Sequence, residues 1–160
     1  MSSKRLFIAV TLSTGLLLSG CTTPLPPQSQ MQREIESHQL PHKPSAANSV
    51  VYVVRPSSMG AAVRFNVFLD DQDPKSEMGY NRGGQYIYFS VEPGAHKIFS
   101  VAENTPELAF DIKPGEIIYI QQRTYPGVLM ARNDLSILPP TEGQWRVKTL
   151  SQGTIIKTSK

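Results

Sequence analysis

The sequence predicts an all-β domain, either an immunoglobulin-like β-sandwich or an open barrel of about seven strands, with a short C-terminal helix. Segments rich in β-branched and aromatic residues recur between residues 49 and 150, at intervals of roughly ten residues. The Pro-Gly pairs at 93–94, 114–115 and 126–127 separate several of them and favour type II turns. The 160 residues of the chain are enough for one such domain.

The periodicity of the apolar residues places the strands. Residues 50–54 form a continuous apolar run, which is typical of a strand buried on both faces. Residues 63–69 and 85–91 alternate, which indicates that one face of each strand lies toward a core. The remaining strands are expected at residues 95–102, 107–112, 116–123 and 128–138.

One helix is expected to begin at Thr141. Its hydroxyl can cap the first turn, and Gln144 stands three residues later, as in a capping box. Trp145, Val147 and Leu150 would give this helix an apolar side. Residues 151–160 are mostly polar and are expected to form a loose tail.

Residues 1–20 have the features of a secretory signal peptide, since Lys4 and Arg5 precede an apolar run with charge at only one end. The run ends in Leu18-Ser19-Gly20-Cys21, which resembles the bacterial lipobox, where the cysteine is acylated and becomes the first mature residue. Cys21 is the only cysteine, and acylation would consume a thiol that is a liability in an oxidising compartment. An ordinary signal peptide and an uncleaved helical anchor are the alternatives.

A lipid on Cys21 would place the protein in the bacterial cell envelope, with membrane lipid as its first partner. The resemblance implies that Thr22, in place of an aspartate, directs it to the outer membrane facing the periplasm, if the host has two membranes. Residues 21–48 are rich in Pro and Gln and are expected to form a flexible tether with a mean reach of about 30 Å. The domain at 49–150 would then stand away from the lipid.

The charge and the spacing of possible metal ligands argue against nucleic acid binding and against metal binding. The net charge is +3 and falls to +1 without Lys4 and Arg5, so nucleic acid binding loses its electrostatic basis. His38 and His42 have a zinc-type spacing, but Pro41 interrupts the helix that this spacing requires. The acidic residues between 70 and 77 do not follow the order of a calcium loop. The sequence therefore predicts no metal and no cofactor.

The sequence contains no GxSxG, HExxH or SxxK pattern, and we expect the protein not to be an enzyme. His96 should share a strand face with Ile98 and pack as a hydrogen-bonded structural histidine. Arg55 belongs to a set of arginines that are scattered through the β region and are expected at the surface.

Tyr86 and Tyr88 are the candidate interaction residues. If Ile87 and its alternate neighbours point inward, both tyrosines point away from the core. Exposed tyrosines are enriched at interfaces, and Arg82 would add a charged rim. The alternative is that the C-terminal helix around Trp145 covers this face.

Several short motifs, taken in order, resemble one family: Val53-Val54-Arg55-Pro56, Phe65-Asn66-Val67-Phe68-Leu69-Asp70, Glu92-Pro93-Gly94-Ala95-His96, and Pro114-Gly115 before Ile118-Tyr119. They are similar to short bacterial lipoproteins that carry a β-rich domain of unknown function. The Pro-Gly-x-His turn also resembles PEGA-type surface domains, which are immunoglobulin-like. The resemblance covers roughly residues 49–150 and implies an anchored envelope module, in which Arg55 and His96 belong to the shared motifs. It supplies no catalytic residue.

These observations together predict a lipid-anchored cell-envelope protein with a non-enzymatic structural or protein-interaction domain and an envelope protein partner that the sequence does not identify. The alternative is a periplasmic module that binds a small ligand or a glycan between its strands.

Replacing Cys21 with serine tests the lipobox prediction. A hydroxyl is a far poorer nucleophile than a thiol near neutral pH, so Cys21→Ser is expected to abolish incorporation of labelled palmitate. Thr22→Ser keeps the cysteine and should be labelled like the parent chain. Palmitate on the Cys21→Ser variant would rule out acylation at this residue.

Overall fold

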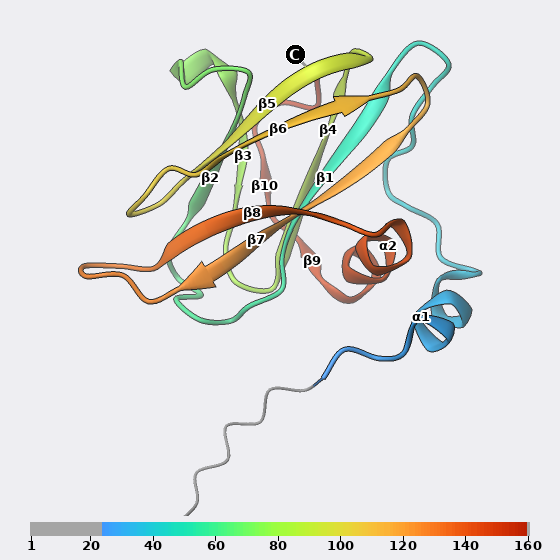
Figure 1. Ribbon diagram of the computed structural model, residues 1–160, viewed down its shortest axis with the longest axis horizontal. Coiled ribbons are helices and arrows are strands. Elements are labelled where there is room, and N and C mark those ends of the chain that lie inside the picture. The colour runs from blue at the N-terminus through green and yellow to red at the C-terminus, as the bar shows by residue number, and fades with distance from the viewer. Residues whose placement is uncertain (1–23, 160) are drawn as a thin grey trace, which may run out of the picture.

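The computed structural model describes residues 24–159 and shows two β-sheets packed face to face (Figure 1). Within these residues each sheet has five strands, and the strand orders do not close into a barrel. The prediction of an all-β sandwich with a short C-terminal helix is confirmed, with ten strands in place of about seven. The predicted signal peptide and Cys21 lie outside the described residues.

The first sheet is built around β1 (Ser49–Arg55). β4 (Gln85–Val91) pairs with β1 antiparallel, and β7 (Ile117–Tyr125) pairs with it parallel. β8 (Arg132–Leu138) lies outside β7, and the short β9 (Ser151–Gln152) lies outside β4. A strand between two long neighbours has both edges paired, so β1 is the centre of this sheet.

The second sheet has β2 (Phe65–Leu69) at its centre. β3 (Glu77–Asn81) and β5 (Gly94–Val101) pair with its two edges, both antiparallel. β6 (Glu107–Ile112) lies outside β5, and β10 (Thr154–Ile155) lies outside β3. The chain therefore ends by adding one short strand to an edge of each sheet.

The main hydrophobic core lies between the two sheets. Alternate residues of the strands meet there, as the period of two predicts. The buried members of this core are Val51, Val53, Val67, Leu69, Met78, Ile87, Phe89, Val91, Ile98, Phe110, Ile112, Ile118, Ile120 and Leu135.

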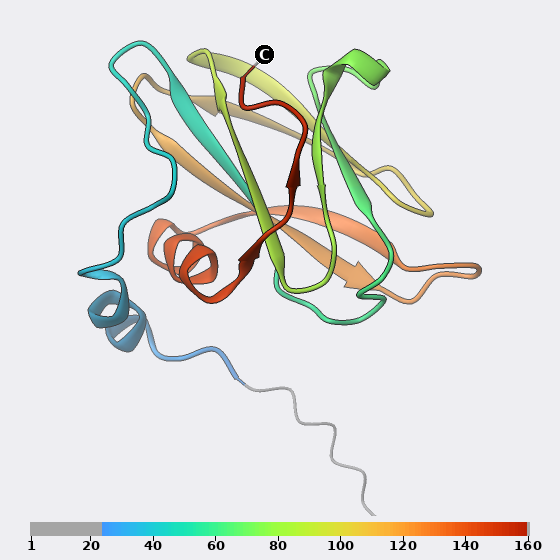
Figure 2. The same cartoon turned by 180° about the vertical axis from the view of Figure 1, so that it is seen from behind.

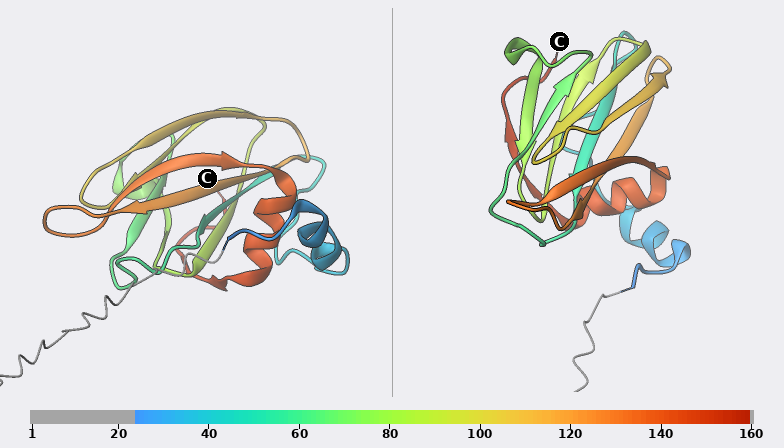
Figure 3. Two further views of the ribbon diagram at one scale, coloured as in Figure 1. Left: turned by 60° about the horizontal axis from the view of Figure 1, so that its bottom comes forward. Right: turned by 60° about the vertical axis from the view of Figure 1, so that its left-hand side comes forward.

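A second core lies on the outer face of the first sheet. α2 (Pro140–Thr149) packs on β1 and β7, and α1 (Gln28–Ile35) packs on α2, as Figures 2 and 3 show. This second core explains why the outward-facing residues of β1 are apolar. Its buried members are Val50, Tyr52, Val54, Tyr86, Tyr119, Leu138 and Val147.

The prediction of a flexible tether over residues 21–48 is wrong for the described part of that segment. α1 begins directly after Pro27 and buries Met31 and Ile35. Glu34 accepts a hydrogen bond of 2.7 Å from the indole N–H of Trp145 in α2. The segment carries a few apolar side chains at helical spacing, and these are enough to dock it on α2.

Other local expectations also need correction. The tail predicted to be loose forms β9 and β10, and Ser159 makes a further bridge to Ser90. The capping box is wrong, because α2 begins at Pro140, and the Thr141 hydroxyl contacts Gln32 at 3.2 Å. β3 was not expected; it follows a 3-10 helix at Pro74–Ser76.

The Pro-Gly turns divide into two kinds. Gly115 has a φ of +74°, which agrees with a type II turn, whereas Gly94 has a φ of +134°, positive as predicted but far from the value of about +80° that this turn type requires. Gly127 does not have a positive φ, so the third Pro-Gly pair is not a turn of this type. A Cβ at Gly127 would lie 2.0 Å from the Met130 carbonyl oxygen, so close packing explains the glycine there.

No helix among residues 24–159 combines the length and the apolar character that crossing a membrane requires.

Gly143 is expected to be essential for the docking of α2. A Cβ at this position would lie 2.1 Å from Cγ and 2.3 Å from Cβ of Tyr119, and neither atom is the free end of a side chain. Helix propensity alone favours Gly143→Ala by about 1 kcal/mol, whereas overpacking costs about 1–3 kcal/mol. We expect a net loss of stability in urea unfolding.

Gly84→Ala is the matched control. Gly84 has a φ of +77° and nothing within 4 Å of an added Cβ, so its substitution costs backbone strain of about 1 kcal/mol without a clash. A Gly143→Ala variant more stable than the parent would show that α2 does not rest closely on Tyr119.

Candidate functional site

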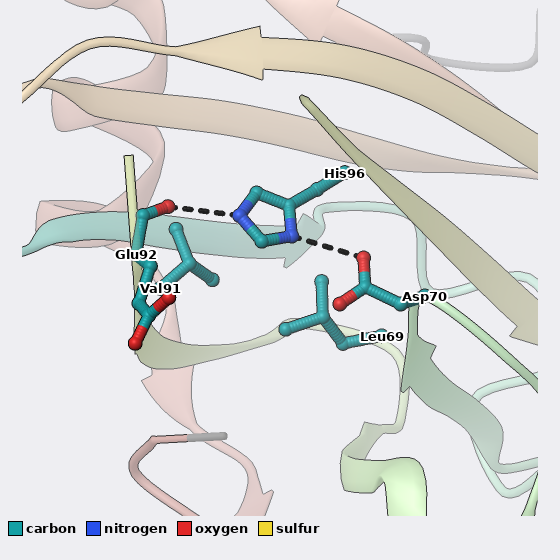
Figure 4. Close-up of a pocket in the computed structure, with 5 residues that line it drawn as sticks. All are labelled: Leu69, Asp70, Val91, Glu92 and His96. Atoms are coloured by element: carbon teal, nitrogen blue, oxygen red, sulfur yellow. Dashed lines mark hydrogen bonds and ion pairs between the residues drawn. The ribbon is translucent and has the colours of Figure 1, made fainter. Parts of the chain in front are cut away.

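One cavity of about 260 Å³ lies where the end of β2 meets the turn between β4 and β5 (Figure 4). Leu69, Asp70, Val91, Glu92 and His96 line it. The Pro-Gly turn starts β5 at Gly94, so His96 falls on the face of β5 that carries Ile98, as predicted. The turn thereby brings the imidazole beside the carboxylate that ends β2.

Both ring nitrogens of His96 are engaged. Nδ1 lies 2.9 Å from the Asp70 carboxylate, and Nε2 lies 2.8 Å from the Glu92 carbonyl oxygen. Both partners are hydrogen-bond acceptors. The two contacts join the β4–β5 turn to the end of β2.

Contacts with Lys97 hold the backbone of Asp70 in the left-handed region. Asp70 is the one non-glycine residue in the described part of the chain with a positive φ, +68°. Its backbone N–H donates to the Lys97 carbonyl at 2.6 Å, and its carboxylate accepts from the Lys97 N–H at 3.3 Å. Aspartate tolerates this region when its side chain bonds locally. The arrangement is a structural lock with a small adjacent cavity.

Arg55 is fully buried, so the prediction of a surface arginine is wrong for this residue. Its guanidinium donates to the carbonyls of Val63 at 2.6 Å, Gly60 at 2.9 Å and Met59 at 3.1 Å. It also lies 3.5 Å from the centre of the Phe65 ring. Burial lowers the pKa of Arg55 to about 10. The side chain organises the β1–β2 loop, which explains an arginine at the end of an apolar strand.

Polar side chains fill the end of the sandwich interior next to Arg55. The Asn81 amide donates to the Val53 carbonyl at 2.9 Å and to Gln122 at 3.1 Å. Gln122 in turn donates to the Ser100 hydroxyl at 2.8 Å, and Asn133 donates to the Ser100 carbonyl at 3.3 Å. These groups pair with one another across both sheets, so they set the relative position of the strands.

Tyr86 and Tyr88 point away from the main core, as predicted, while Ile87 points into it. The prediction that they form an exposed surface is wrong. Tyr86 is 8% exposed and belongs to the second core, and Tyr88 is partly buried beside it. Arg82 is exposed, and its guanidinium lies 5.3 Å from the ring centre of Tyr80, a different tyrosine.

His42, in the segment before β1, packs over Tyr52 and Tyr88 on the outer face of the first sheet. Its ring stacks on Tyr88 at 5.0 Å, and its Nε2 lies 2.8 Å from the Ser90 hydroxyl. The Tyr52 hydroxyl donates to the His42 carbonyl at 2.6 Å and accepts from its N–H at 2.9 Å. His42 is therefore a packing residue. Within residues 24–159, no group of three or more His, Cys, Asp or Glu side chains is arranged to hold a metal ion.

The loop between β7 and β8 is the feature that sequence reasoning missed. We call residues 125–131 the hairpin tip; it projects beyond both sheets in Figures 1 and 2. Val128 is 88% exposed and Leu129 is 91% exposed. The signal in the sequence is the apolar run Val128-Leu129-Met130 directly after the Pro-Gly pair, which the strand expected at residues 128–138 includes.

One carboxylate fixes the conformation of the hairpin tip. Glu103 accepts hydrogen bonds from the backbone N–H groups of Val128, Leu129 and Met130, at 2.9, 2.7 and 2.8 Å. The bonds from these three N–H groups lower the pKa of Glu103. The three most exposed apolar residues of the loop therefore have their backbone N–H groups already paired.

Comparison with known proteins gives no functional assignment. No family model matches the chain. The chain is 27% identical over 150 residues to an uncharacterized protein of Haemophilus influenzae, an alignment that covers 92% of this chain and 85% of that protein. The similarity extends along most of both chains. The resemblance to lipoproteins and PEGA-type domains remains a hypothesis.

The buried tyrosines are expected to make the protein sensitive to alkali. Burial raises the pKa of Tyr119 to about 12, and it also raises those of Tyr52 and Tyr86. Above pH 10 the unfolded chain releases these protons before the folded protein does. Each tyrosine therefore lowers stability by up to about 1.4 kcal/mol per pH unit until its folded pKa is reached. The lowered pKa values of Arg55 and Tyr80 act in the opposite direction, but the three buried tyrosines outnumber them.

Tyr119→Phe should reduce this alkaline dependence, measured by urea unfolding at about pH 9 and about pH 11. Tyr125→Phe changes an exposed ring, 44% accessible, and should leave the dependence as it is in the parent. Equal dependence in the parent and in Tyr119→Phe would show that Tyr119 is not buried as described.

Proposed function

We propose that the protein is a lipid-anchored component of the bacterial cell envelope whose β-sandwich serves as a non-enzymatic interaction module. The observation that carries the proposal is the lipobox-like sequence Leu18-Ser19-Gly20-Cys21 immediately before the folded body. The outer membrane, facing the periplasm, is the proposed location if the host has two membranes.

The packing of the N-terminal segment changes how such an anchor would act. Pro24 is the third residue after Cys21, and Pro24, Leu25 and Pro26 line a depression together with Trp145. An extended chain covers at most about 3.6 Å per residue, so the acylated cysteine would lie within roughly 11 Å of the folded body. The domain would sit close to the lipid, which replaces the expectation of a long spacer.

An interaction role is supported by the exposed hairpin tip more than by a ligand cavity. Ligand sites usually offer about 300–1,000 Å³ with unpaired polar groups. The cavity at His96 is smaller, at about 260 Å³, and its imidazole is already bonded on both nitrogens. Two depressions of about 440 and 410 Å³ fall within this range, and both border the hairpin tip. The apolar side chains of the hairpin tip, in contrast, are presented outward.

The mass of the N-terminal peptide tests the anchor. The protein is purified from cell membranes with detergent and cleaved, and its first peptide is weighed. We expect this peptide to begin at Cys21 and to carry the added mass of a diacylglyceryl group and an amide-linked acyl chain. A peptide that begins elsewhere, or a free Cys21 thiol, would contradict the proposal.

A further inference from the structure

We propose that the hairpin tip enters the headgroup region of an anionic lipid bilayer, as a second membrane contact beside the anchor. This inference deepens the proposed function by naming lipid as a partner of the folded domain itself. It depends on the proposed function only for the position of the anchor.

The first argument is the kind of surface that the tip presents. Val128 and Leu129 are almost fully exposed, and Met130 and Tyr125 are 47% and 44% exposed. The tip borders a depression of about 410 Å³. Met59 of the β1–β2 loop, 49% exposed, lines the other side of this depression. Aliphatic side chains with a neighbouring tyrosine are typical of segments that rest at the boundary between headgroups and acyl chains.

The second argument is the state of the backbone. A loop that leaves water must already have its N–H groups paired, because lipid offers them no acceptor. The Glu103 carboxylate supplies three such acceptor contacts within 2.9 Å, to Val128, Leu129 and Met130. The apolar side chains can therefore leave water without leaving these donors unpaired.

The third argument is charge. Arg132 of β8 lies opposite Tyr125 of β7 in the strand ladder, at the base of the tip. Arg123 lies on the same face of β7, two residues further from the tip, opposite Asp134. Arg64 and Arg82 border a depression that they share with Met130. All these arginines are exposed. Glu103 keeps its negative charge, which Arg132 partly balances, so the arginines leave the surroundings of the tip with an excess of positive charge. Long arginine side chains around an apolar centre are complementary to anionic headgroups.

The fourth argument is the position of the chain start. In Figures 1 and 2 the hairpin tip, the β1–β2 loop and the first described residues all lie in the lower half of the molecule. An anchor attached just before Pro24 would bring the tip and Met59 toward the bilayer that holds it.

A dye on the tip measures this contact directly. Because Cys21 is the only cysteine and acylation consumes its thiol, Leu129→Cys gives a single labelling site in the full lipidated chain. The labelled protein is placed in vesicles of phosphatidylcholine and phosphatidylglycerol that contain a lipid-borne quencher. Lys113→Cys, at the exposed turn between β6 and β7, is the control.

We expect lipid quenching several-fold stronger at position 129 than at position 113, and weaker quenching at 129 in phosphatidylcholine alone. Replacing Arg123 and Arg132 with glutamine should remove the difference between the two lipid compositions. A dye at 129 that stays in water, with quenching no stronger than at 113, would overturn the proposal. Shielding in native membranes without lipid quenching would indicate a protein on the tip and would also overturn it.

The two proposals fail separately. Lipid on Cys21 together with a water-exposed dye at 129 would leave the anchor in place and remove the tip contact. An unmodified Cys21 would remove the anchor; the same dye measurement, made in the Cys21→Ser background with added vesicles, would still decide the tip contact.

Discussion

The burial of β1 on both faces is the constraint on which the rest of the structure depends. All seven of its residues are buried, and its alternate side chains enter two different cores. The inner set is covered by the second sheet, as in any sandwich. The outer set needs a cover of its own, and α2 supplies most of it. α1 then packs on α2, and the carbonyl oxygen of His42 accepts a hydrogen bond from the Tyr52 hydroxyl. The N-terminal segment is therefore part of the fold because the outer face of β1 needs a cover.

The two ends of the sandwich interior have different chemistry. One end holds Arg55 and a chain of amide and hydroxyl groups that links both sheets, the other is bordered by the His96–Asp70 contact, and the apolar core lies between them. A buried guanidinium is costly, and here backbone carbonyls of the β1–β2 loop offset the cost. The hairpin tip projects from this polar end. Hydrogen bonds with defined geometry thus fix the loops that border the tip, whereas the apolar core contributes mainly burial.

Much of the fold could be predicted from the sequence, because period-two patterns identify strands that have one face in a core. The continuous run at 50–54 also indicated correctly a strand with no exposed face. The failures share a cause, which is that partners distant in sequence decide the outcome. β3 contains Gly79 and Asn81, poor strand formers, but Gly79 accommodates the backbone of Thr154, and Asn81 bonds into the polar interior. Tyr86 was assigned the correct face, but nothing in its neighbourhood shows that a helix covers it. The hairpin tip is not predicted because Glu103, whose carboxylate accepts the hydrogen bonds that fix it, lies in another loop.

The parallel pairing of β1 with β7 governs the order in which the chain can fold. Val50 pairs with Ile117 and Val54 with Gln121, so the first sheet joins segments that most of the domain separates in sequence. β4 can join β1 earlier, but the other edge of β1 stays open until β7 has been made. Such non-local pairing slows folding and leaves an apolar strand edge exposed in the meantime. Late completion of this sheet therefore makes β1 the segment most exposed to wrong pairing while the chain folds.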